Sequence, residues 1–473
     1  MLLALIIVVG TALRLTSLLW GKDFFFGAAD SASFYEIADN IYKGRGPVVD
    51  FVYSFLFSHK DLTHPDDWWE PLFPYTIAAF FMIFGQSLFT AKFTSFVFGV
   101  LTIPLVFYVG RRIFDDKVGL LASLFIAINP YHIFYSGFIL KEVLYSFIFL
   151  ATVFMFYSAY RTDKTLYWIF SGLLIGLAYL TRYNAALLLL IPFVILFISK
   201  KLEYARTRNF IISLVVISIV LLPWALYTYD YFGTPLYTNQ RSMIFYYSPT
   251  RLMWDPNTPS LEEFFTSVKV PEKYAELNLD VFKTLFITKI AMPLYNLTTQ
   301  SPLIFTPILF TFFILSLLRQ KDEFAKIIQL VSLMTVIFFM LGGLGVFPTE
   351  KYILPLIVVS MPLIGKLTLE MTKGFAYNRL ITVIIAVSFI FSIASLTNLM
   401  LSWKFSGSIG VFSGENSDWI SRLQNYEKVG TWMKGNTRSD DAVMSNYPWE
   451  LHYFSDRRAV ITPRISNLNG QVR

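Results

Sequence analysis

The sequence predicts an α-helical protein that crosses a membrane about eleven times and carries a small α/β domain near its C-terminal end. Composition is the first reason, since 55% of the 473 residues are hydrophobic and only 15% are charged. A water-soluble fold of that composition would expose large apolar patches, and a disordered chain is far less apolar. The other two reasons are a series of long apolar runs and the distribution of Lys and Arg between them.

The apolar runs define the spans, because a membrane helix needs about 20 mostly apolar residues. The first run is interrupted by Arg14 and lacks a basic region before it, so we interpret it as a retained span and not as a cleaved signal peptide. Residues 72–84 are also apolar, but this run is short and begins within EPLFP, so we interpret it as a helix at the interface. The eleven predicted spans are 2–20, 94–110, 118–135, 143–160, 165–181, 184–199, 209–227, 303–318, 327–346, 352–366 and 380–401.

The connections between the spans indicate the orientation. If the N-terminus is cytoplasmic and 72–84 does not cross, every cytoplasmic connection carries two to four Lys or Arg. The first external loop, 21–93, instead has five Lys and Arg against nine Asp and Glu. Short basic loops on one side are the positive-inside pattern, and counting 72–84 as a span would disrupt it. The cytoplasmic connections are 111–117, 161–164, 199–208, 319–326 and 366–379.

These spans divide the chain into a transmembrane domain, 1–401, and a C-terminal tail, 402–473. The transmembrane domain has two large external loops, 21–93 and 228–302. An odd number of spans places the tail outside, where we expect a small extracytoplasmic α/β domain. The sequence ends soon after the last predicted strand, so we expect that this domain can be incomplete. Its predicted elements are a helix over 418–434, a strand over 442–445, a helical turn over 448–454 and a strand over 459–462.

Several function classes lose support from what the sequence lacks. There is no Cys, which excludes a disulfide framework, a thiolate zinc site and a cysteine nucleophile. Walker A, GxGxxG and GxSxG patterns are missing, which disfavours nucleotide-driven pumping and serine hydrolysis. The net charge of +7 follows from the basic cytoplasmic loops, so it predicts no nucleic-acid partner. Asp66, Asp67 and Glu70 could contact a divalent cation such as Mg²⁺ or Mn²⁺, and solvated charge is the alternative.

Two acids near external span ends are the candidates for proton chemistry. Asp30 follows the first span by about ten residues in FGAADS, where partial desolvation would raise its pKa toward that of a general base. The alternative for Asp30 is a helix N-cap. Glu142 opens the span at Val143, where an acid also compensates the helix dipole, and the neighbouring Lys141 can snorkel. Both acids fall on the external face under this topology.

Four basic residues close to external span ends could bind an anionic lipid phosphate. An arginine offers a bidentate fork and a lysine a point charge, although snorkelling explains each one singly. Arg182 stands out, because a charge in so short a turn between two spans is costly unless it is used. The four are Lys92, Arg182, Arg241 and Lys351.

The order of segments along nearly the whole chain resembles a known family. The segments are EPLFPY, GQSLFTAKFTSFVFGVLTIPLVFYVGRRIFDDKVGLLASLF, INPYHIFYSGFILKEVLYSF, LTRYNAALLLL, LLPWALYTYDYFGTPLYTN, PTEKYILPL and DDAVMSNYPWELHYFSDRRAV. They look like the GT-C glycosyltransferases, in the branch of dolichyl- or polyprenyl-phosphate-mannose protein mannosyltransferases and lipid A aminoarabinose transferases. The resemblance implies a prokaryotic plasma-membrane enzyme, facing outward, that moves a sugar from a polyprenyl-phosphate donor to an acceptor with inversion.

The resemblance also assigns roles to residues. Asp30 matches the acid of the first external loop and would be the base, although relatives often have two adjacent acids where Ser31 follows here. Glu142 falls where the second external loop has an acid, and it would assist. Lys92, Arg182 and Lys351 match basic positions and would bind the donor phosphate, with Arg241 as a further candidate.

Three other interpretations stay open. A polytopic transporter or lipid flippase would also have many spans and a few intramembrane charges, but it would often show related halves. An oligosaccharyltransferase catalytic subunit shares the superfamily but would be expected to carry a WWDYG-like motif, which Trp68-Trp69-Glu70 is not. A catalytically inactive scaffold is the third. The sequence leaves the sugar open and allows protein, glycolipid or polysaccharide acceptors.

Overall fold

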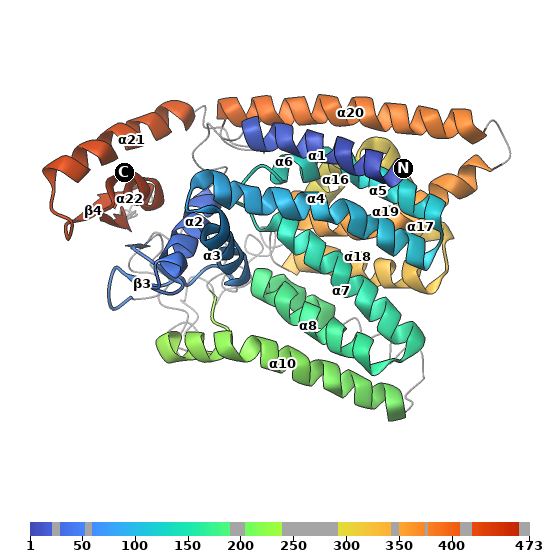
Figure 1. Ribbon diagram of the computed structural model, residues 1–473, viewed down its shortest axis with the longest axis horizontal. Coiled ribbons are helices and arrows are strands. Elements are labelled where there is room, and N and C mark those ends of the chain that lie inside the picture. Colours follow the sequence, from blue (N-terminus) through green and yellow to red (C-terminus); the bar gives the residue numbers. More distant parts are fainter. Residues whose placement is uncertain are drawn as a thin grey trace, which may run out of the picture.

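The computed structural model describes residues 1–20, 29–52, 59–189, 204–238, 292–341, 350–373, 377–406 and 419–462. Long helices run side by side through the body of the molecule (Figure 1). Shorter helices and all of the described strands gather at one end of this bundle, on the left of the same view. The helices of the bundle are α1 (Leu2–Trp20), α4 (Leu88–Ile113), α5 (Asp116–Ala127), α6 (Pro130–Tyr135), α7 (Glu142–Thr162), α8 (Thr165–Thr181), α10 (Tyr204–Phe232), α16 (Met292–Phe305), α17 (Pro307–Arg319), α18 (Glu323–Leu341), α19 (Glu350–Thr372) and α20 (Tyr377–Ser406).

The prediction of a polytopic helical membrane protein is confirmed. Within the described ranges, six helices are long and apolar enough to cross a membrane, or seven if the bent pair α16 and α17 counts as one span. The six are Leu2–Trp20, Leu88–Ile113, Glu142–Thr162, Thr207–Phe232, Lys351–Thr372 and Arg379–Leu401. Among the other predicted spans, 165–181 forms the 17-residue helix α8. Residues 190–199 of the predicted span 184–199 lie outside the described residues, and Tyr183–Leu189 form a 3₁₀ helix.

The predicted span 118–135 is not one helix. It divides into α5 and α6, because Asn129 begins a new helix: its side chain accepts a hydrogen bond from the His132 backbone N–H, and Pro130 has no N–H to continue α5. Arg14 of α1 fills the break. Its guanidinium donates to the carbonyl oxygens of Ile126 at 2.9 Å and Ala127 at 3.0 Å, which satisfies the end of α5.

Replacing Arg14 by methionine is therefore expected to destabilise the protein, even though it makes α1 more apolar. Each buried carbonyl left without a donor costs about 1–3 kcal/mol. Thermal unfolding in detergent should show a loss of several degrees relative to wild type. The matched control is Arg111→Met, which removes an arginine that is exposed at the basic end of α4. Equal melting temperatures for the two variants would show that Arg14 does not support the helix break.

Helix α19 lies at the centre of the bundle, whereas α1, α10 and α20 lie at its periphery. Protein covers 83% of the apolar window of α19, but only 22% of the windows of the three peripheral helices. Figure 1 shows α20 along one edge of the bundle and α10 along the opposite edge. Gly365 of α19 permits close approach to α5, because a Cβ there would lie 3.1 Å from the Val118 carbonyl oxygen. The apolar residues that α1, α10 and α20 expose are suited to contact with lipid.

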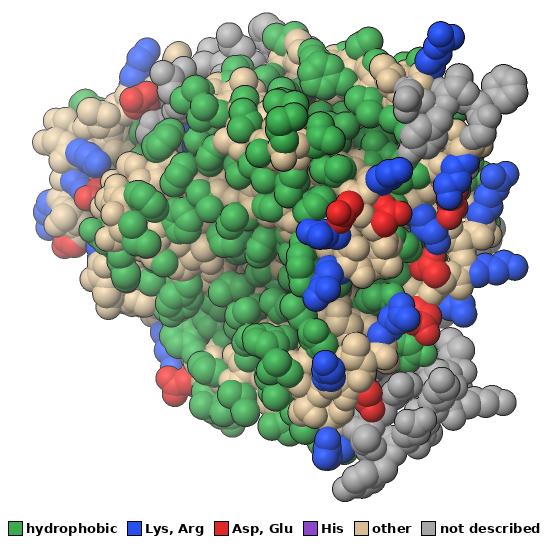
Figure 2. Space-filling view, turned by 45° about the vertical axis from the view of Figure 1, so that its right-hand side comes forward, with side chains coloured by type: hydrophobic (Ala, Val, Ile, Leu, Met, Phe, Trp, Pro, Cys, Tyr) green, Lys and Arg blue, Asp and Glu red, His purple; other side chains and the backbone are tan. Residues whose placement is uncertain are grey.

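The surface has the charge distribution expected for a membrane protein. Figure 2 shows a broad hydrophobic surface on the side of the bundle, with Lys, Arg, Asp and Glu collected at its right-hand end. The connections α4–α5 and α7–α8 lie at this end, as does the N-terminus. Two of the five predicted basic connections, 111–117 and 161–164, therefore share one end of the molecule with the N-terminus, in agreement with the positive-inside pattern.

The opposite end is built from the first external loop and the tail. The predicted interfacial helix is α3 (Leu72–Phe84), which packs beside α2 (Ala29–Tyr42) across the end of the bundle. Strand β1 (Val48–Val49) pairs antiparallel with β3 (His64–Pro65). The tail forms α21 (Trp419–Asn436), β4 (Ala442–Ser445), α22 (Pro448–Ser455) and β5 (Arg458–Ile461), which coincide with the four predicted elements within about two residues.

The sheet of the tail also contains a strand from the first loop. Strand β2 (Phe51–Val52) pairs in parallel with β5, which pairs in parallel with β4. Helix α22 packs against α2, where Tyr35 and Tyr453 meet edge to face with ring centroids 5.7 Å apart. The first external loop and the C-terminal tail therefore fold together into one unit, although the predicted boundary at residue 402 separates them in sequence.

Candidate active site

Six charged side chains meet where the first external loop covers the end of the bundle. They come from distant segments: α2 supplies Asp30, Glu70 lies two residues before the start of α3, and the start of α7 supplies Lys141 and Glu142. Arg182 follows α8, and Lys351 lies in the first turn of α19. We call these six residues the charged cluster. It contains three acidic and three basic residues, so their formal charges balance.

Asp30 and Lys351 form the most accessible pair of the cluster. The Lys351 ammonium donates to Asp30 Oδ2 at 2.8 Å, and the two side chains are 31% and 13% exposed. Asp30 lies inside the first turn of α2, so it is not the residue that precedes the helix, as an N-cap would be. Burial raises the pKa of Asp30, but the charges of Lys351, Lys141 and Arg182 outweigh burial and hold it below its ordinary value. The expected rise toward neutrality is therefore wrong for the ligand-free protein.

Arg182 is fixed by three contacts. Its Nη1 donates to the Lys351 carbonyl oxygen at 2.8 Å, and its Nη2 lies 3.6 Å from Glu142 Oε1. The guanidinium also lies over the Tyr352 ring, 4.3 Å from the ring centroid. Arg182 and Glu142 are 4% and 2% exposed. A planar cation held in this way keeps a defined orientation toward an incoming anion.

Lys141 and Glu70 form the buried part of the cluster. The ammonium donates to Glu70 Oε2 at 2.6 Å, and it lies 4.7 Å from the Trp69 ring centroid. Lys141 is only 2% exposed, so the prediction that it snorkels to the surface is wrong. The sequence did not predict this pair, because Glu70 is 71 residues away from Lys141 and no local pattern joins the two.

Two carboxylate oxygens of the cluster remain available. Glu70 Oε1 and Glu142 Oε2 are buried and accept no hydrogen bond from any described residue. A buried acceptor without a donor is costly unless a ligand or water supplies one. Hydroxyl or ammonium groups of a bound molecule would satisfy both.

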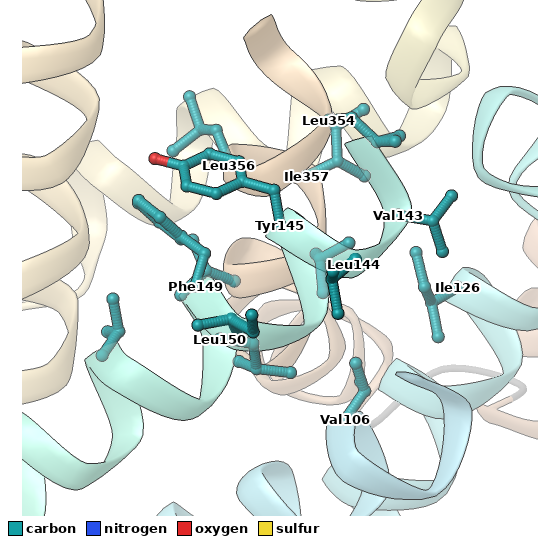
Figure 3. Close-up of a cluster of buried hydrophobic side chains, with 14 of the residues drawn as sticks. Val106, Ile126, Val143, Leu144, Tyr145, Phe149, Leu150, Leu354, Leu356 and Ile357 are labelled. Atoms are coloured by element: carbon teal, nitrogen blue, oxygen red, sulfur yellow. The ribbon is translucent and has the colours of Figure 1, made fainter. Parts of the chain in front are cut away.

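An apolar pocket adjoins the charged cluster. Tyr145 of α7 and Tyr352 of α19 border both, because the Arg182 guanidinium lies over each ring. Figure 3 shows Tyr145 and Phe149 on the side of α7 that faces Leu356 of α19. The pocket thus extends an apolar wall away from the cations. Its lining residues are Tyr145, Phe149, Asn184, Leu187, Leu188, Val331, Met334, Thr335, Tyr352, Pro355 and Leu356.

The structure brings four of the six predicted site residues together. Asp30, Glu142, Arg182 and Lys351 are joined by the contacts above. Lys92 is buried near the start of α4, 1% exposed, and it takes part in other contacts but in none of these ion pairs. Arg241 lies outside the described residues.

The acids near Trp68 are buried, so the interpretation of Asp66, Asp67 and Glu70 as solvated charge is wrong. They are 3%, 2% and 3% exposed. Asp66 Oδ1 accepts from the backbone N–H groups of Trp68 and Trp69. Burial, followed by the charge of Asp67, raises the pKa of Asp66 to about 7.

The raised pKa of Asp66 makes a prediction about stability and pH. The folded state binds a proton more tightly than the unfolded state, so stability falls as the pH rises from about 4 and the loss is complete above about 7. Asp66→Asn cannot ionise and keeps an oxygen for the two N–H groups. The melting temperature of Asp66→Asn minus that of wild type is expected to increase from pH 5 to pH 8. The exposed Asp61→Asn is the control, and a pH-independent difference for Asp66→Asn would contradict the assignment.

The comparisons with known proteins agree with this architecture. Residues 63–227 match the family model of the dolichyl-phosphate-mannose-protein mannosyltransferases. The Archaeoglobus fulgidus oligosaccharyltransferase in complex with Zn and sulfate matches with a TM-score of 0.65 and 17% identity, over 100% of this chain and 64% of that chain. ArnT from Cupriavidus metallidurans bound to undecaprenyl phosphate matches with a TM-score of 0.54 and 13% identity, over 97% of this chain and 85% of that chain. No curated protein matches in sequence.

A third solved structure is the archaeal oligosaccharyltransferase AglB from Archaeoglobus fulgidus with an inhibitory peptide and a dolichol-phosphate. It matches with a TM-score of 0.63 and 15% identity, over 97% of this chain and 63% of that chain. This chain thus spans less than two thirds of the length of the archaeal enzymes.

The helical bundle with its covering external loops defines the class: this is a polytopic membrane protein with the GT-C glycosyltransferase fold. Within that class, the segment from the first external loop through α10 has the sequence pattern of the dolichyl-phosphate-mannose-protein mannosyltransferase family. The resemblance read from the sequence is confirmed at this level.

Proposed function

We propose that this protein is a membrane glycosyltransferase that moves a sugar from a polyprenyl-phosphate donor to an extracytoplasmic acceptor, with inversion. One observation carries the proposal: the charged cluster, with Asp30 at its most accessible pair, adjoins an apolar pocket between α7, α18 and α19. Such a site offers cations for a lipid phosphate, an apolar surface for the lipid chain and a carboxylate for the acceptor.

Lys351 and Arg182 are proposed to bind the donor phosphate. Lys351 supplies a point charge and Arg182 a planar fork, and together they stabilise the negative charge that develops as the phosphate departs. The polyprenyl chain would begin in the pocket beside Tyr145 and Tyr352, where each buried methylene contributes about 0.8 kcal/mol. Lys92 and Arg241 remain proposed as further basic partners of the donor.

Asp30 is proposed to act as the general base. A phosphate is already a good leaving group, so the reaction needs one base for the acceptor hydroxyl or amine and no strong acid. In the ligand-free protein, Lys351 lowers the pKa of Asp30. A bound phosphate competes for Lys351 and adds a negative charge nearby, so donor binding would raise the pKa of Asp30. The base would then be activated only when the donor is in place.

Glu142 is proposed to assist by orienting the acceptor. Its Oε1 faces Arg182, while Oε2 accepts from no described residue. The free oxygen can accept a hydrogen bond from an acceptor group without losing the contact with Arg182. Asp30 and Glu142 are linked through Lys351 and Arg182, so the two acids flank the proposed phosphate site.

The proposed setting is the plasma membrane of a prokaryote, with the site facing outward. The basic connections lie at the opposite end of the bundle, which supports this orientation. Similar solved structures contain dolichol-phosphate, undecaprenyl phosphate or an acceptor peptide, which supports a lipid-linked donor and a protein acceptor. Glycolipid and polysaccharide acceptors fit the same chemistry, and a divalent cation is compatible with it.

The transporter interpretation has less support from the structure, because the ion pairs of the cluster lie at one end of the bundle and not at its middle. An oligosaccharyltransferase remains the second candidate, since the archaeal enzymes give the higher TM-scores. The two candidate activities differ in the donor. The proposed glycosyltransferase would use a sugar on a polyprenyl monophosphate, whereas an oligosaccharyltransferase would use a lipid-linked oligosaccharide.

The test is sugar transfer in proteoliposomes that contain purified full-length protein. Radiolabelled polyprenyl-phosphate sugars are supplied with peptide, glycolipid or polysaccharide acceptors, and transferred label is counted. Transfer from the monophosphate sugar supports the proposal. Transfer from a lipid-linked oligosaccharide alone would favour the oligosaccharyltransferase, and solute movement across sealed vesicles without any transfer would favour a transporter.

A further inference from the structure

A second cluster of ligand-type side chains lies between the first external loop and the tail. Glu36 comes from α2, Asp50 from the link between β1 and β2, and His452 from α22. Their ligand atoms all lie within 4.8 Å of one another. The three residues are 8%, 7% and 7% exposed, so they face one another within the folded unit.

The His452 ring is oriented by a backbone carbonyl, as the rings of metal-binding histidines often are. Its Nδ1 donates to the Arg457 carbonyl oxygen at 2.8 Å, and its Nε2 lies 3.0 Å from Glu36 Oε1. A backbone carbonyl bound to one ring nitrogen fixes the orientation of the ring and directs the other nitrogen at a metal. Here that other nitrogen points at two carboxylates.

The two carboxylates are supported in a similar way. Asn40 Nδ2 donates to Glu36 Oε1 at 3.1 Å, and the Thr63 hydroxyl donates to Asp50 Oδ1. Each of the three ligand residues therefore has its own hydrogen-bond support from a neighbouring group. Supporting contacts of this kind accompany the ligands of built metal sites.

Arg45 supplies a cation to the cluster in the metal-free protein. It donates to both Asp50 oxygens at 2.7 Å, and its side chain is 43% exposed while that of Asp50 is 10% exposed. An exposed guanidinium can move into solvent, whereas the buried ligand atoms stay in place. Arg45 would thus compete with a metal ion for Asp50.

We propose that Glu36, Asp50 and His452 bind a zinc ion that ties the tail to the first external loop. One imidazole nitrogen and two carboxylates suit Zn²⁺, whereas Mg²⁺ prefers an all-oxygen site. The ion would join the parts already connected by the pairing of β2 with β5 and by the packing of α22 on α2. Because α2 also carries Asp30, a bound zinc ion would help to fix the position of the helix that carries the proposed base. Zinc binding itself does not depend on the proposed transfer reaction.

The experiment uses full-length, tag-free protein in detergent, because a histidine tag would itself bind zinc. The protein is treated with EDTA, dialysed against Zn²⁺ or Mg²⁺, and analysed for bound metal and for melting temperature. We expect one Zn²⁺ per chain with a rise of several degrees, and no effect of Mg²⁺. His452→Ala and Glu36→Gln should each lower the zinc affinity by at least about tenfold.

Two further variants separate a zinc site from an ion-pair network. Arg45→Gln removes the competing cation, so a zinc site predicts unchanged or tighter zinc binding and a larger zinc-dependent rise in melting temperature. A network of ion pairs predicts only a loss of stability that zinc does not restore. Glu427→Gln, on the exposed face of α21, is the control and should bind zinc as wild type does. Folded wild-type protein that binds no stoichiometric zinc would overturn the proposal, as would zinc binding that survives in both His452→Ala and Glu36→Gln.

Discussion

Replacing Asp30 by asparagine is expected to lower the rate constant for sugar transfer by about 10²–10⁴-fold, which is the usual contribution of a general base. Asparagine has the same shape but cannot take the acceptor proton. The change also releases Lys351 from its 2.8 Å ion pair, so the lysine becomes free to bind the donor phosphate. The KM for the donor should therefore stay unchanged or fall while kcat collapses, as measured by initial rates over a range of donor concentrations.

The control for this variant is Asp39→Asn. Asp39 lies on the same helix, α2, and pairs with Lys43 at 2.6 Å, away from the charged cluster. Its transfer rate should stay within about twofold of wild type, because asparagine keeps an oxygen for the hydrogen bond from Gln86 and the lost pair with the half-exposed Lys43 contributes little. Wild-type transfer by Asp30→Asn would remove Asp30 from the proposed role. A parallel loss in both variants would point to damage to α2 and not to loss of the base.

The wild-type pH profile gives an independent measure of the same base. The acid limb of kcat/KM reports the free enzyme, and that of kcat reports the substrate complex. Lys351 holds the pKa of Asp30 low in the ligand-free protein, and a bound phosphate removes that effect. The acid limb of kcat should therefore lie at higher pH than that of kcat/KM.

The sequence predicted the parts of the fold that depend on local patterns. The helices of the tail, the interfacial helix 72–84 and the basic end of the bundle all follow from apolar period, run length and charge sign. It also placed Asp30 and Glu142 on one face, because topology alone fixes the end of the bundle at which each residue lies. Their connection through Arg182 and Lys351 is what the structure adds.

The features that the sequence did not predict all depend on partners far apart in the chain. A lysine at the end of a span usually extends its ammonium to the membrane surface, whereas Lys141 is buried. The ion pair with Glu70 offsets the cost of burying the charge of Lys141. Strand β2 is two residues long, too short for an alternation pattern, and it is defined by its pairing with β5. The direction of the Asp30 pKa shift likewise depends on Lys351, which lies 321 residues away.

Replacing Arg182 by lysine is expected to raise the KM for the polyprenyl-phosphate donor and to lower kcat/KM by about 10–100-fold. Lysine keeps the charge but loses the fork, the contact with the Tyr352 ring and the 2.8 Å hydrogen bond to the Lys351 carbonyl oxygen. A charge-assisted hydrogen bond is worth about 1.5–3 kcal/mol, which corresponds to that range. Donor titrations with a fixed acceptor would measure the change.

Arg161→Lys is the matched control for this prediction, because Arg161 pairs with Glu323 at the basic end of the bundle and is 58% exposed. A short-chain donor separates the roles of phosphate and lipid chain. If Arg182 binds the phosphate, Arg182→Lys weakens long-chain and short-chain donors by the same factor. If Arg182 instead only positions Tyr352 at the pocket, Arg182→Lys raises the KM for the long-chain donor but not for the short-chain donor, because phosphate binding is unchanged. An unchanged KM for both donors would exclude Arg182 from the donor site and leave Lys351 as the cation on which the proposed mechanism depends.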